Sequence, residues 1–342
     1  MGGFVYGSMA AVRGLATLSV TLLGLLLVTF VIGRVMPIDP VVAAVGDKAS
    51  PETYAKAREA LGLDQPVWIQ FGRYFGGIAL GDLGQSSVSN RPVSEDIARV
   101  FPATVELSTL GILVGVVFGV PLGVYAAHQR NRWPDQIIRS VSLLGYSTPV
   151  FWLGLIGLLI FYAQLGWSGG PGRIDTAYRY SMDEWSGFML VDTLRSGDRD
   201  AFLSAVSHIA LPSLLLGYFS LAYIARMTRG FMIEELGKEY VTMARIKGAS
   251  EAGVLWRHAL PNMLVPLTTV IALAYAQLLE GTVLTETVFA WPGLGLYITN
   301  SLFSADMPAV LGGTLVVGVC FVLLNKISEI LYPFLDPRTR SR

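Results

Sequence analysis

The charged segment Glu239–Pro261, between two apolar runs, carries the most informative residue spacing in the chain. Ala244 and Gly248 are followed, after nine residues, by His258, and a Leu-Pro pair then closes the segment. A membrane protein rarely places so many charges on one internal loop unless that loop touches something in the cytoplasm. We therefore interpret the segment as a docking surface for a cytosolic protein. The alternative is a basic loop that only sets membrane topology.

Local signals predict the shape of this segment. Glu239–Lys247 lacks Gly and Pro, so it can form two or three helical turns. Gly248 can adopt a positive φ and end that helix, and Ser250 can cap the start of another. Pro261 stands near the first turn of the next span, where a missing amide costs little. We expect a short helix across the membrane axis that transmits movement to two spans.

Motifs for catalysis and metal binding are absent from the sequence. It contains no GxxxxGK[ST] phosphate loop, no GxSxG elbow and no HExxH pair. Cys320 is the single cysteine, and the three histidines are far apart along the chain. We predict no catalytic residues, no metal site and no cofactor in this chain. The net charge of +0 gives no indication of nucleic-acid binding.

Composition indicates the protein class. The chain is 53% hydrophobic and 15% charged, whereas soluble domains are about one quarter charged. The mean hydropathy is +0.54. We predict an all-α, polytopic membrane protein with six spans, because a run of about 20 apolar residues crosses the hydrocarbon core. The uncharged runs are Gly14–Gly33, Leu107–Ala127, Ser140–Gly172, Ala201–Ala225, Ala259–Leu279 and Met307–Asn325.

Two of these runs need interpretation. Gly14–Gly33 could be a cleaved signal peptide, but it is longer than a typical apolar signal region and no small-residue cleavage site follows. We interpret it as a retained helix that ends before the proline-containing stretch 36–40. Ser140–Gly172 is too long for one span, so we expect a loop from Gln164 onward and a kink at Pro149. Glycines within the spans, such as Gly111, Gly115 and Gly119, are expected to allow close helix packing.

Loop charges predict the orientation. Basic residues exceed acidic ones in 128–139 and 226–257, and three arginines lie in the tail. We therefore place both termini in the cytoplasm, with four sections: 1–36, an external segment 37–99, a core 100–335 containing a loop at 229–262, and a tail 336–342.

In the external segment we expect a helix at Pro51–Leu61 and aromatic side chains of Ile69–Leu80 on the outer membrane surface. This segment covers the external mouth, and it could also dock an external partner. The second external segment, Trp167–Asp200, is expected to lack long regular structure.

Short motifs throughout the chain resemble one family. The segment 240–262 reads YVxxARxKG…RHALxN. Further matches, in the same order as in the family, are LGLDQP at 61–66, GDLG at 81–84, RPV at 91–93, PATVEL at 102–107, PLGV at 121–124, PVFWLG at 149–154 and ETVFAWPGLG at 286–295. Together they resemble the permeases of ABC importers of the dipeptide/oligopeptide/nickel family. The stretch 36–40, directly after the first span, is typical of the first (B-type) permease of the pair.

The resemblance implies a type I ABC importer permease fold in a bacterial inner membrane. The partners would be the lipid bilayer, a homologous second permease, two ATP-binding subunits that hold ATP and Mg, and an external substrate-binding protein. The cargo would be di- or oligopeptides; nickel chelates, opines and oligosaccharides are the alternatives. An ATP-independent channel or secondary transporter is less favoured, since neither inverted repeats nor several paired intramembrane charges are evident. The implied contacts with the ATP-binding subunits are Tyr240, Val241, Ala244, Arg245, Lys247, Gly248, Ala249, Ser250, His258, Leu260 and Pro261.

Three polar residues of the fifth span are candidates for the substrate path. An ionisable group inside a span is costly and therefore suggests function. Gln277 precedes Glu280, and Glu286, which fits the family pattern, is expected at the outer mouth. Glu280 departs from the pattern. It either faces the pathway and meets a cationic or amine-bearing substrate, or pairs with a polar group of the partner permease.

Gly248 is expected to tolerate substitution least, because a Cβ there opposes the turn. We predict that Gly248→Asp abolishes transport while the protein still inserts into the membrane. Normal uptake by a stably inserted variant would refute this prediction.

Overall fold

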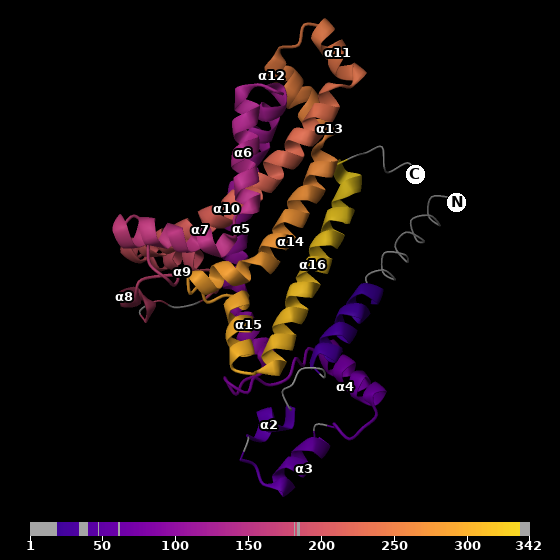
Figure 1. Cartoon of the computed structure of the whole chain (residues 1–342), viewed down its shortest axis with the longest axis vertical. Coiled ribbons are helices and arrows are strands. Elements are labelled where there is room, and N and C mark those ends of the chain that lie inside the picture. The colour runs from indigo at the N-terminus through magenta and orange to yellow at the C-terminus, as the bar shows by residue number, and fades with distance from the viewer. Residues whose placement is uncertain are drawn as a thin grey trace, which may run out of the picture. The chain divides into compact units, whose positions relative to one another are not determined.

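The computed structural model describes residues 19–33, 40–46, 48–60, 62–180, 182 and 185–335. In these residues the regular structure is helical, apart from one isolated bridge between Gln85 and Pro92, so the predicted all-α class is confirmed (Figure 1). The chain forms two compact units. Unit 1 contains Met1–Phe101 and Leu294–Val322, and unit 2 contains Pro102–Gly293 and Leu323–Arg342. The predicted core 100–335 is thus shared between the units.

Four described helices are long and apolar enough to cross a membrane: α5 (Val93–His128), α10 (Arg199–Leu236), α14 (Leu264–Val288) and α16 (Met307–Leu335). A bent helix pair forms either one broken span or a re-entrant loop. Its pieces are α6 (Trp133–Ser147) and α7 (Val150–Gly157), which a π-helical stretch, Leu158–Gln164, continues. The two pieces meet at 96°. Pro149 stands at this break, as predicted, and helical structure ends at Gln164.

The first predicted span is only partly within the described residues. The apolar helix Ser19–Gly33 matches the later part of the run Gly14–Gly33, and the earlier part lies outside them. The count of six spans therefore stays a prediction.

Several spans are longer than the uncharged runs that predicted them. α5 begins at Val93 instead of Leu107, with Glu95 and Asp96 in its first turn, where carboxylates favour a helix N-terminus. α14 begins at Leu264 and continues through Glu280 to Val288, so the predicted bounds Ala259–Leu279 were wrong at both ends. An uncharged run marks only residues in hydrocarbon, whereas helices extend beyond it. At 1.5 Å per residue, the 38 residues of α10 span about 57 Å, against about 30 Å of hydrocarbon.

Unit 1 joins the N-terminal helices to part of the C-terminal region. The helix Ser19–Gly33 is bonded to α4 (Val67–Ala79) through Thr29 and Tyr74, whose hydroxyls are 3.0 Å apart. Between them in sequence lie α2 (Pro40–Val45) and α3 (Pro51–Ala60), and α3 confirms the helix predicted at Pro51–Leu61. An apolar cluster joins the start of α5 to α15 (Leu294–Phe303) and α16. The buried residues of this cluster are Val93, Ile97, Leu294 and Ala309.

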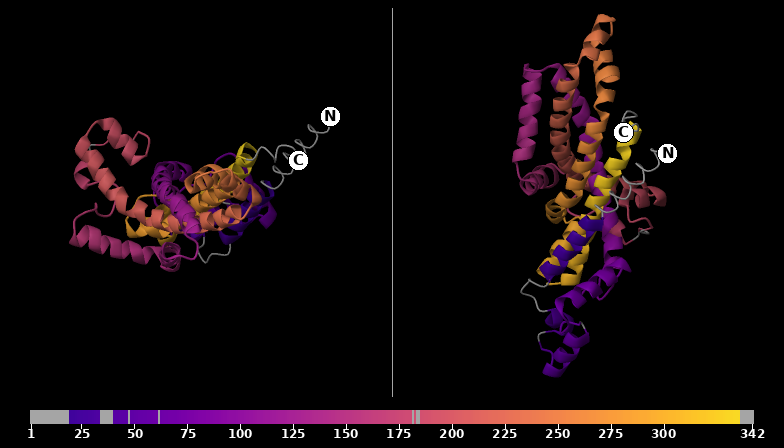
Figure 2. Two further views of the ribbon diagram at one scale, coloured as in Figure 1. Left: turned by 90° about the horizontal axis from the view of Figure 1, so that it is seen from above. Right: turned by 90° about the vertical axis from the view of Figure 1, so that its right-hand side faces the viewer.

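Unit 2 is built around α10. This helix lies between α6 and α14 and contacts both (Figure 2). A row of glycines on α5, at positions 111, 115, 119 and 123, faces α10. A Cβ on Gly111 would lie 2.9 Å from the Cβ of Leu216, and one on Gly123 would lie 2.6 Å from the carbonyl oxygen of Ala225. The predicted role of these glycines in close helix packing is therefore confirmed.

The segment between the broken span and α10 contains two short helices, α8 (Thr176–Arg179) and α9 (Met189–Ser196). Its other described residues are irregular, as predicted. A buried ion pair attaches it to α5, because Arg173 Nη2 lies 2.6 Å from Glu106 Oε2. The second Glu106 oxygen accepts from the Leu190 amide at 2.8 Å. The carboxylate thus has partners at both oxygens, which offsets part of the cost of burying a charge.

Candidate functional site

The segment after α10 contains a short helix, α11 (Glu239–Ile246), followed by α12 (Glu251–Gly253) and a π-helical stretch, Val254–Ala259. α13 (Leu260–Asn262) then leads into α14. Figure 1 shows α11 and α12 together at one end of the unit 2 helices. Pro261 lies in the first turn of α13, as its missing amide requires. The predicted short helix between two spans is confirmed.

The turn after α11 is a Schellman motif in which Gly248 is the left-handed residue. Gly248 has a φ of +84°, and its amide donates to the Arg245 carbonyl at 2.9 Å. The Ala249 amide donates to the Ala244 carbonyl at 3.1 Å. This pair of bonds satisfies the last carbonyls of the helix and needs a left-handed residue at Gly248. A Cβ there would meet open space in this chain, so the requirement is conformational and not steric.

Two side chains complete the turn. The Ser250 hydroxyl accepts from the Gly253 amide at 3.2 Å and so caps α12, as predicted. Arg245 Nε donates to Glu251 Oε1 at 3.0 Å, which joins α11 to α12 across the glycine. The guanidinium of Arg245 lowers the pKa of the exposed Glu251 carboxyl, mainly through this hydrogen bond. The pair is exposed, so its contribution to stability is small.

Tyr240 connects α11 back to α10. Its hydroxyl donates to Glu235 Oε2 at 2.6 Å, and Lys238 forms a short ion pair with the other oxygen of Glu235. Burial, followed by the hydrogen bond to Glu235, raises the pKa of Tyr240 to about 12. Because Glu235 is itself buried, this link holds the start of α11 on the end of α10.

The predicted contact residues fall on two faces of the segment. Val241 and Ala244 are buried within this chain, so they can position α11 but present little surface to another protein. Ala249 and Leu260 are partly buried. The remaining predicted residues are accessible: Tyr240, Arg245, Lys247, Gly248, Ser250, His258 and Pro261.

Three large apolar residues on the accessible face were not among the individually named contacts, although two of them lie in the predicted contact range Tyr240–Ser250. Met243, Ile246 and Trp256 are 52%, 74% and 45% exposed. Spacing could have found the first two, since Met243 and Ile246 are three apart, as are the buried Val241 and Ala244. The pair Met243 and Ile246 is shifted by two residues from the pair Val241 and Ala244, which is about half a helical turn. One pair therefore faces inward and the other outward. We call Met243, Ile246 and Trp256 the apolar docking face.

The polar residues of α14 are not gathered at one place. Gln277 and Glu280 are exposed and lie on one side of the helix, three residues apart. Glu286 is fully buried, and its Oε1 accepts from the Thr104 hydroxyl at 2.6 Å. Its carboxylate has no exposed surface in this chain, so a place on the substrate path is not supported by the geometry. Gln277 and Glu280 remain accessible for such a role.

The buried Glu286 belongs to a network at the junction of α5 and α14. The Trp291 ring is fully buried, and its indole nitrogen donates to the Ala103 carbonyl at 2.9 Å. Arg173 lies over the same ring, 5.5 Å from its centroid. The network thus joins α5, the irregular segment after the broken span and the residues that follow α14. Most of its polar groups are paired with one another within the chain.

No described group of three His, Cys, Asp or Glu side chains could hold a metal ion. Cys320 is free and half-buried. The α11–α12 segment exposes both polar and apolar side chains, and the described residues there show no nucleophile–base pair.

Comparison with known proteins agrees with this architecture. The family described as "Binding-protein-dependent transport system inner membrane component" matches residues 119–341, and the family of its N-terminal part matches residues 9–108. The chain is 43% identical to the di/tripeptide transport system permease protein DppB of Pseudomonas aeruginosa (strain UCBPP-PA14), over 96% of this chain and 97% of that protein.

Two relatives from Escherichia coli (strain K12) are similar over comparable lengths. The dipeptide transport system permease protein DppB is 39% identical over 96% of this chain and 98% of its own length. The probable D,D-dipeptide transport system permease protein DdpB is 41% identical over 92% of each chain. The predicted resemblance is confirmed, and this chain belongs to the family of inner-membrane permease components of binding-protein-dependent transport systems.

Proposed function

We propose that this multi-pass membrane permease is one of two permease chains in an ATP-driven importer of di- or oligopeptides. The observation that carries the proposal is the α11–α12 segment, which is closed by specific bonds yet exposes an apolar docking face. The names of the relatives support the cargo class, since those printed above are peptide permeases. The partners would be a second permease, two ATP-binding subunits with ATP and Mg, and an external binding protein.

The docking face would receive an ATP-binding subunit. Met243 and Ile246 offer exposed apolar surface, while Arg245 and Lys247 provide charge beside it. Apolar anchors with a polar rim are typical of protein interfaces. Of the predicted contacts, Val241 and Ala244 would act by positioning α11, because both are buried.

Movement at this site would pass to two spans. α11 is tied to α10 through Tyr240 and Glu235, and it contacts the stretch Val254–Ala259 that leads toward α14. ATP binding would draw the two ATP-binding subunits together and move both links at once. The pathway would then alternate between inward and outward openings, because the nucleotide has a different affinity for the two states.

The exposed side of α14 would line the path or contact the second permease. Gln277 and Glu280 lie on this side. If Glu280 faces the path, its carboxylate would attract the amino group of a peptide. If it faces the partner chain, it would pair with a polar group there.

The proposed orientation places the docking face and both termini in the cytoplasm. It can be tested by replacing Cys320 with serine and introducing single cysteines at Ser87 or Thr242, both exposed. A membrane-impermeant thiol reagent should label Ser87→Cys in intact cells and Thr242→Cys only after permeabilisation. The reverse pattern would overturn the orientation.

ATP hydrolysis by the complete complex tests the function. The chain would be reconstituted with its second permease, ATP-binding subunits and binding protein, and offered short peptides, nickel chelates and oligosaccharides in turn. We expect stimulation by peptides alone. Stimulation by another class would correct the cargo, whereas uptake without the ATP-binding subunits would overturn the importer mechanism.

A further inference from the structure

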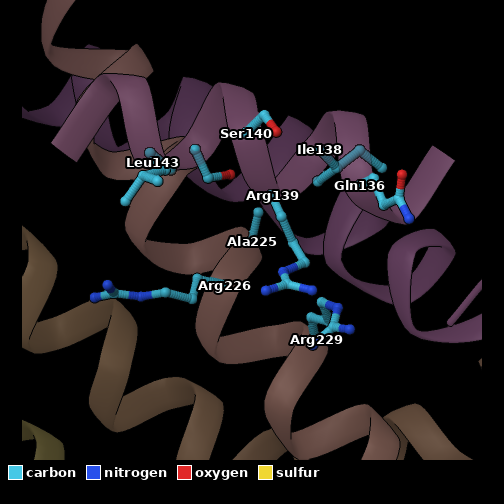
Figure 3. Close-up of a pocket in the computed structure, with 10 residues that line it drawn as sticks. Gln136, Ile138, Arg139, Ser140, Leu143, Ala225, Arg226 and Arg229 are labelled. Carbon is cyan, nitrogen blue, oxygen red and sulfur yellow. The ribbon is translucent and has the colours of Figure 1, made fainter. Parts of the chain in front are cut away.

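A cavity of about 510 Å³ lies between α6 and α10 (Figure 3). Its volume is in the range of ligand pockets. Its lining is mixed, with apolar side chains beside the polar residues Gln136, Arg139, Ser142, Arg226 and Arg229.

The guanidinium groups of this cavity retain capacity for an anion. Arg229 binds the buried Asp135 through Nε and Nη2, at 2.5 and 2.7 Å. This pairing occupies one edge of the guanidinium and leaves Nη1 and the second Nη2 hydrogen on the other. Arg139 is exposed and interacts electrostatically with Asp135, without an ion pair to any described residue.

Figure 3 shows how the arginines lie. The side chains of Arg139 and Arg229 approach each other from α6 and α10. Arg226, one turn earlier on α10, extends the other way, and its guanidinium lies 5.7 Å from the centroid of the Tyr223 ring. The first two form a two-sided donor group, and Arg226 adds positive charge at the rim.

The depth of this group matches a lipid headgroup. Arg139 is the last charged residue before the uncharged run that begins at Ser140, and Arg226 is the first after the run that ends at Ala225. Both arginines therefore stand where a span meets the membrane surface. Next to them, α6 exposes Val141, Leu143 and Leu144 by 43%, 64% and 63%. A ligand with an anionic head and apolar chains fits both features.

We propose that this cavity binds the phosphate group of an anionic phospholipid, held between Arg139 and the open edge of Arg229. The acyl chains would lie along the exposed apolar side of α6. Anionic lipids are bound by basic pockets between helices on the cytoplasmic side. The assignment to the cytoplasmic leaflet rests on the orientation proposed above, whereas the binding itself does not.

The test is lipid binding to the purified full chain. The chain in detergent is mixed with equal amounts of phosphatidylglycerol and phosphatidylcholine, and retained lipid is counted by native mass spectrometry. We expect preferential retention of phosphatidylglycerol. Arg139→Gln should weaken it about tenfold, since it removes charge-assisted hydrogen bonds. Arg139→Lys should be intermediate, because it keeps the charge and loses the planar fork.

Arg130→Gln is the matched control, because it removes the same charge from an exposed position outside the cavity. It should retain phosphatidylglycerol like the unchanged chain. Arg226→Gln, at the rim, should show a smaller loss than Arg139→Gln, and it decides the question if Arg139→Gln does not fold.

Three results would overturn the proposal. They are equal retention of the two lipids, an equal loss in Arg130→Gln, and displacement of the lipid by millimolar inorganic phosphate, which would indicate a site for soluble anions. The assay contains no cargo and no ATP-binding subunit. A failure of peptide-stimulated hydrolysis would therefore leave this result unaffected.

Discussion

At Gly248, substitutions can distinguish two reasons for the glycine, which are the backbone conformation and the space around the residue. The φ of +84° disfavours a side chain, while an added Cβ meets nothing within 4 Å in this chain. A left-handed conformation costs most residues about 1–2 kcal/mol, but asparagine adopts it more readily. We therefore expect Gly248→Val to lose most peptide-stimulated ATP hydrolysis and Gly248→Asn to keep most of it, with both proteins inserted.

Measurement of ATP hydrolysis in the reconstituted complex shows whether the turn conformation or the open space makes glycine necessary at position 248. If Gly248→Asn fails as completely as Gly248→Val, the open space around the glycine is needed by a docking subunit and the turn is not the limiting feature. Gly248→Asp adds a charge to the same test and should be the most impaired of the three.

Tyr240 makes stability depend on pH in the alkaline range. Burial and Glu235 raise its pKa to about 12, from a usual value of 10.0. The folded chain therefore holds this proton more tightly than the unfolded chain does. The resulting stability is complete below about pH 10 and is lost as the pH rises toward 12.

Thermal unfolding in detergent tests this expectation. Between about pH 10 and pH 12, the unfolding temperature of the unchanged chain should fall more steeply than that of Tyr240→Phe, which has no proton to lose. Tyr180→Phe is the control, because Tyr180 is 92% exposed. Parallel curves for Tyr240→Phe and the unchanged chain would contradict the prediction.

At the scale of elements, α11 has one face that is buried in the fold and one that is exposed, to which we assign docking. Ile246 is 74% exposed, so Ile246→Ser should leave the unfolding temperature nearly unchanged. Burial of such a side chain at an interface contributes about 1.5–3 kcal/mol. The variant should therefore bind the ATP-binding subunits about tenfold or more weakly.

Titration of those subunits against the purified chain measures this effect. Leu194→Ser is the matched control, since Leu194 is 68% exposed on α9, far from α11 in sequence. Equal binding by both variants would remove Ile246 from the docking face.

The close contact between α5 and α10 predicts how glycine substitutions in these two helices change the free energy of unfolding. A Cβ on Gly115 would lie 2.7 Å from the Cβ of Ser220, which overpacks the contact. A Cβ on Gly230, also within a helix, meets nothing within 4 Å. We expect Gly115→Ala to lower the free energy of unfolding by about 1–3 kcal/mol. Gly230→Ala should leave it unchanged or raise it by up to about 1 kcal/mol.

Denaturation in mild detergent compares these two variants directly. The pair is informative because both changes add one methyl group to a helical glycine. Similar stabilities would show that α5 and α10 can separate without cost.

At the scale of the whole molecule, the role that we propose for the exposed side of α14 depends on the assembly with a second permease. We expect Glu280→Gln to reduce uptake of a dipeptide with a free amino group about tenfold, since a charged hydrogen bond is lost. An N-acetylated peptide of the same sequence should be unaffected. Equal impairment of both peptides would assign Glu280 to the partner permease, and unchanged transport of both would remove it from the path.

The local part of the candidate site could be predicted because its signals are local. The run Glu239–Lys247, the glycine at 248 and the serine at 250 determine a helix, a left-handed turn and a cap from neighbouring residues alone. The family resemblance could also be read from the order of short motifs, and the family matches confirm it.

Helix bounds and burial could not be predicted in the same way. Uncharged runs indicated where spans lie, but α10 and α14 continue beyond them because a helix does not end at the membrane surface. Glu286 follows the family pattern, yet it is buried and bonded to Thr104, which is 182 residues away along the chain.

The sequence by itself determined the all-α membrane class, the position of the short helix between two spans and the family, because composition, turn chemistry and motif order are properties of the linear chain. Only the tertiary structure decided which side of α11 is exposed, that Glu286 is enclosed and that Arg139 and Arg229 line one cavity. The physical reason is that exposure and charge pairing depend on side chains from distant parts of the chain, and helix packing alone brings these together.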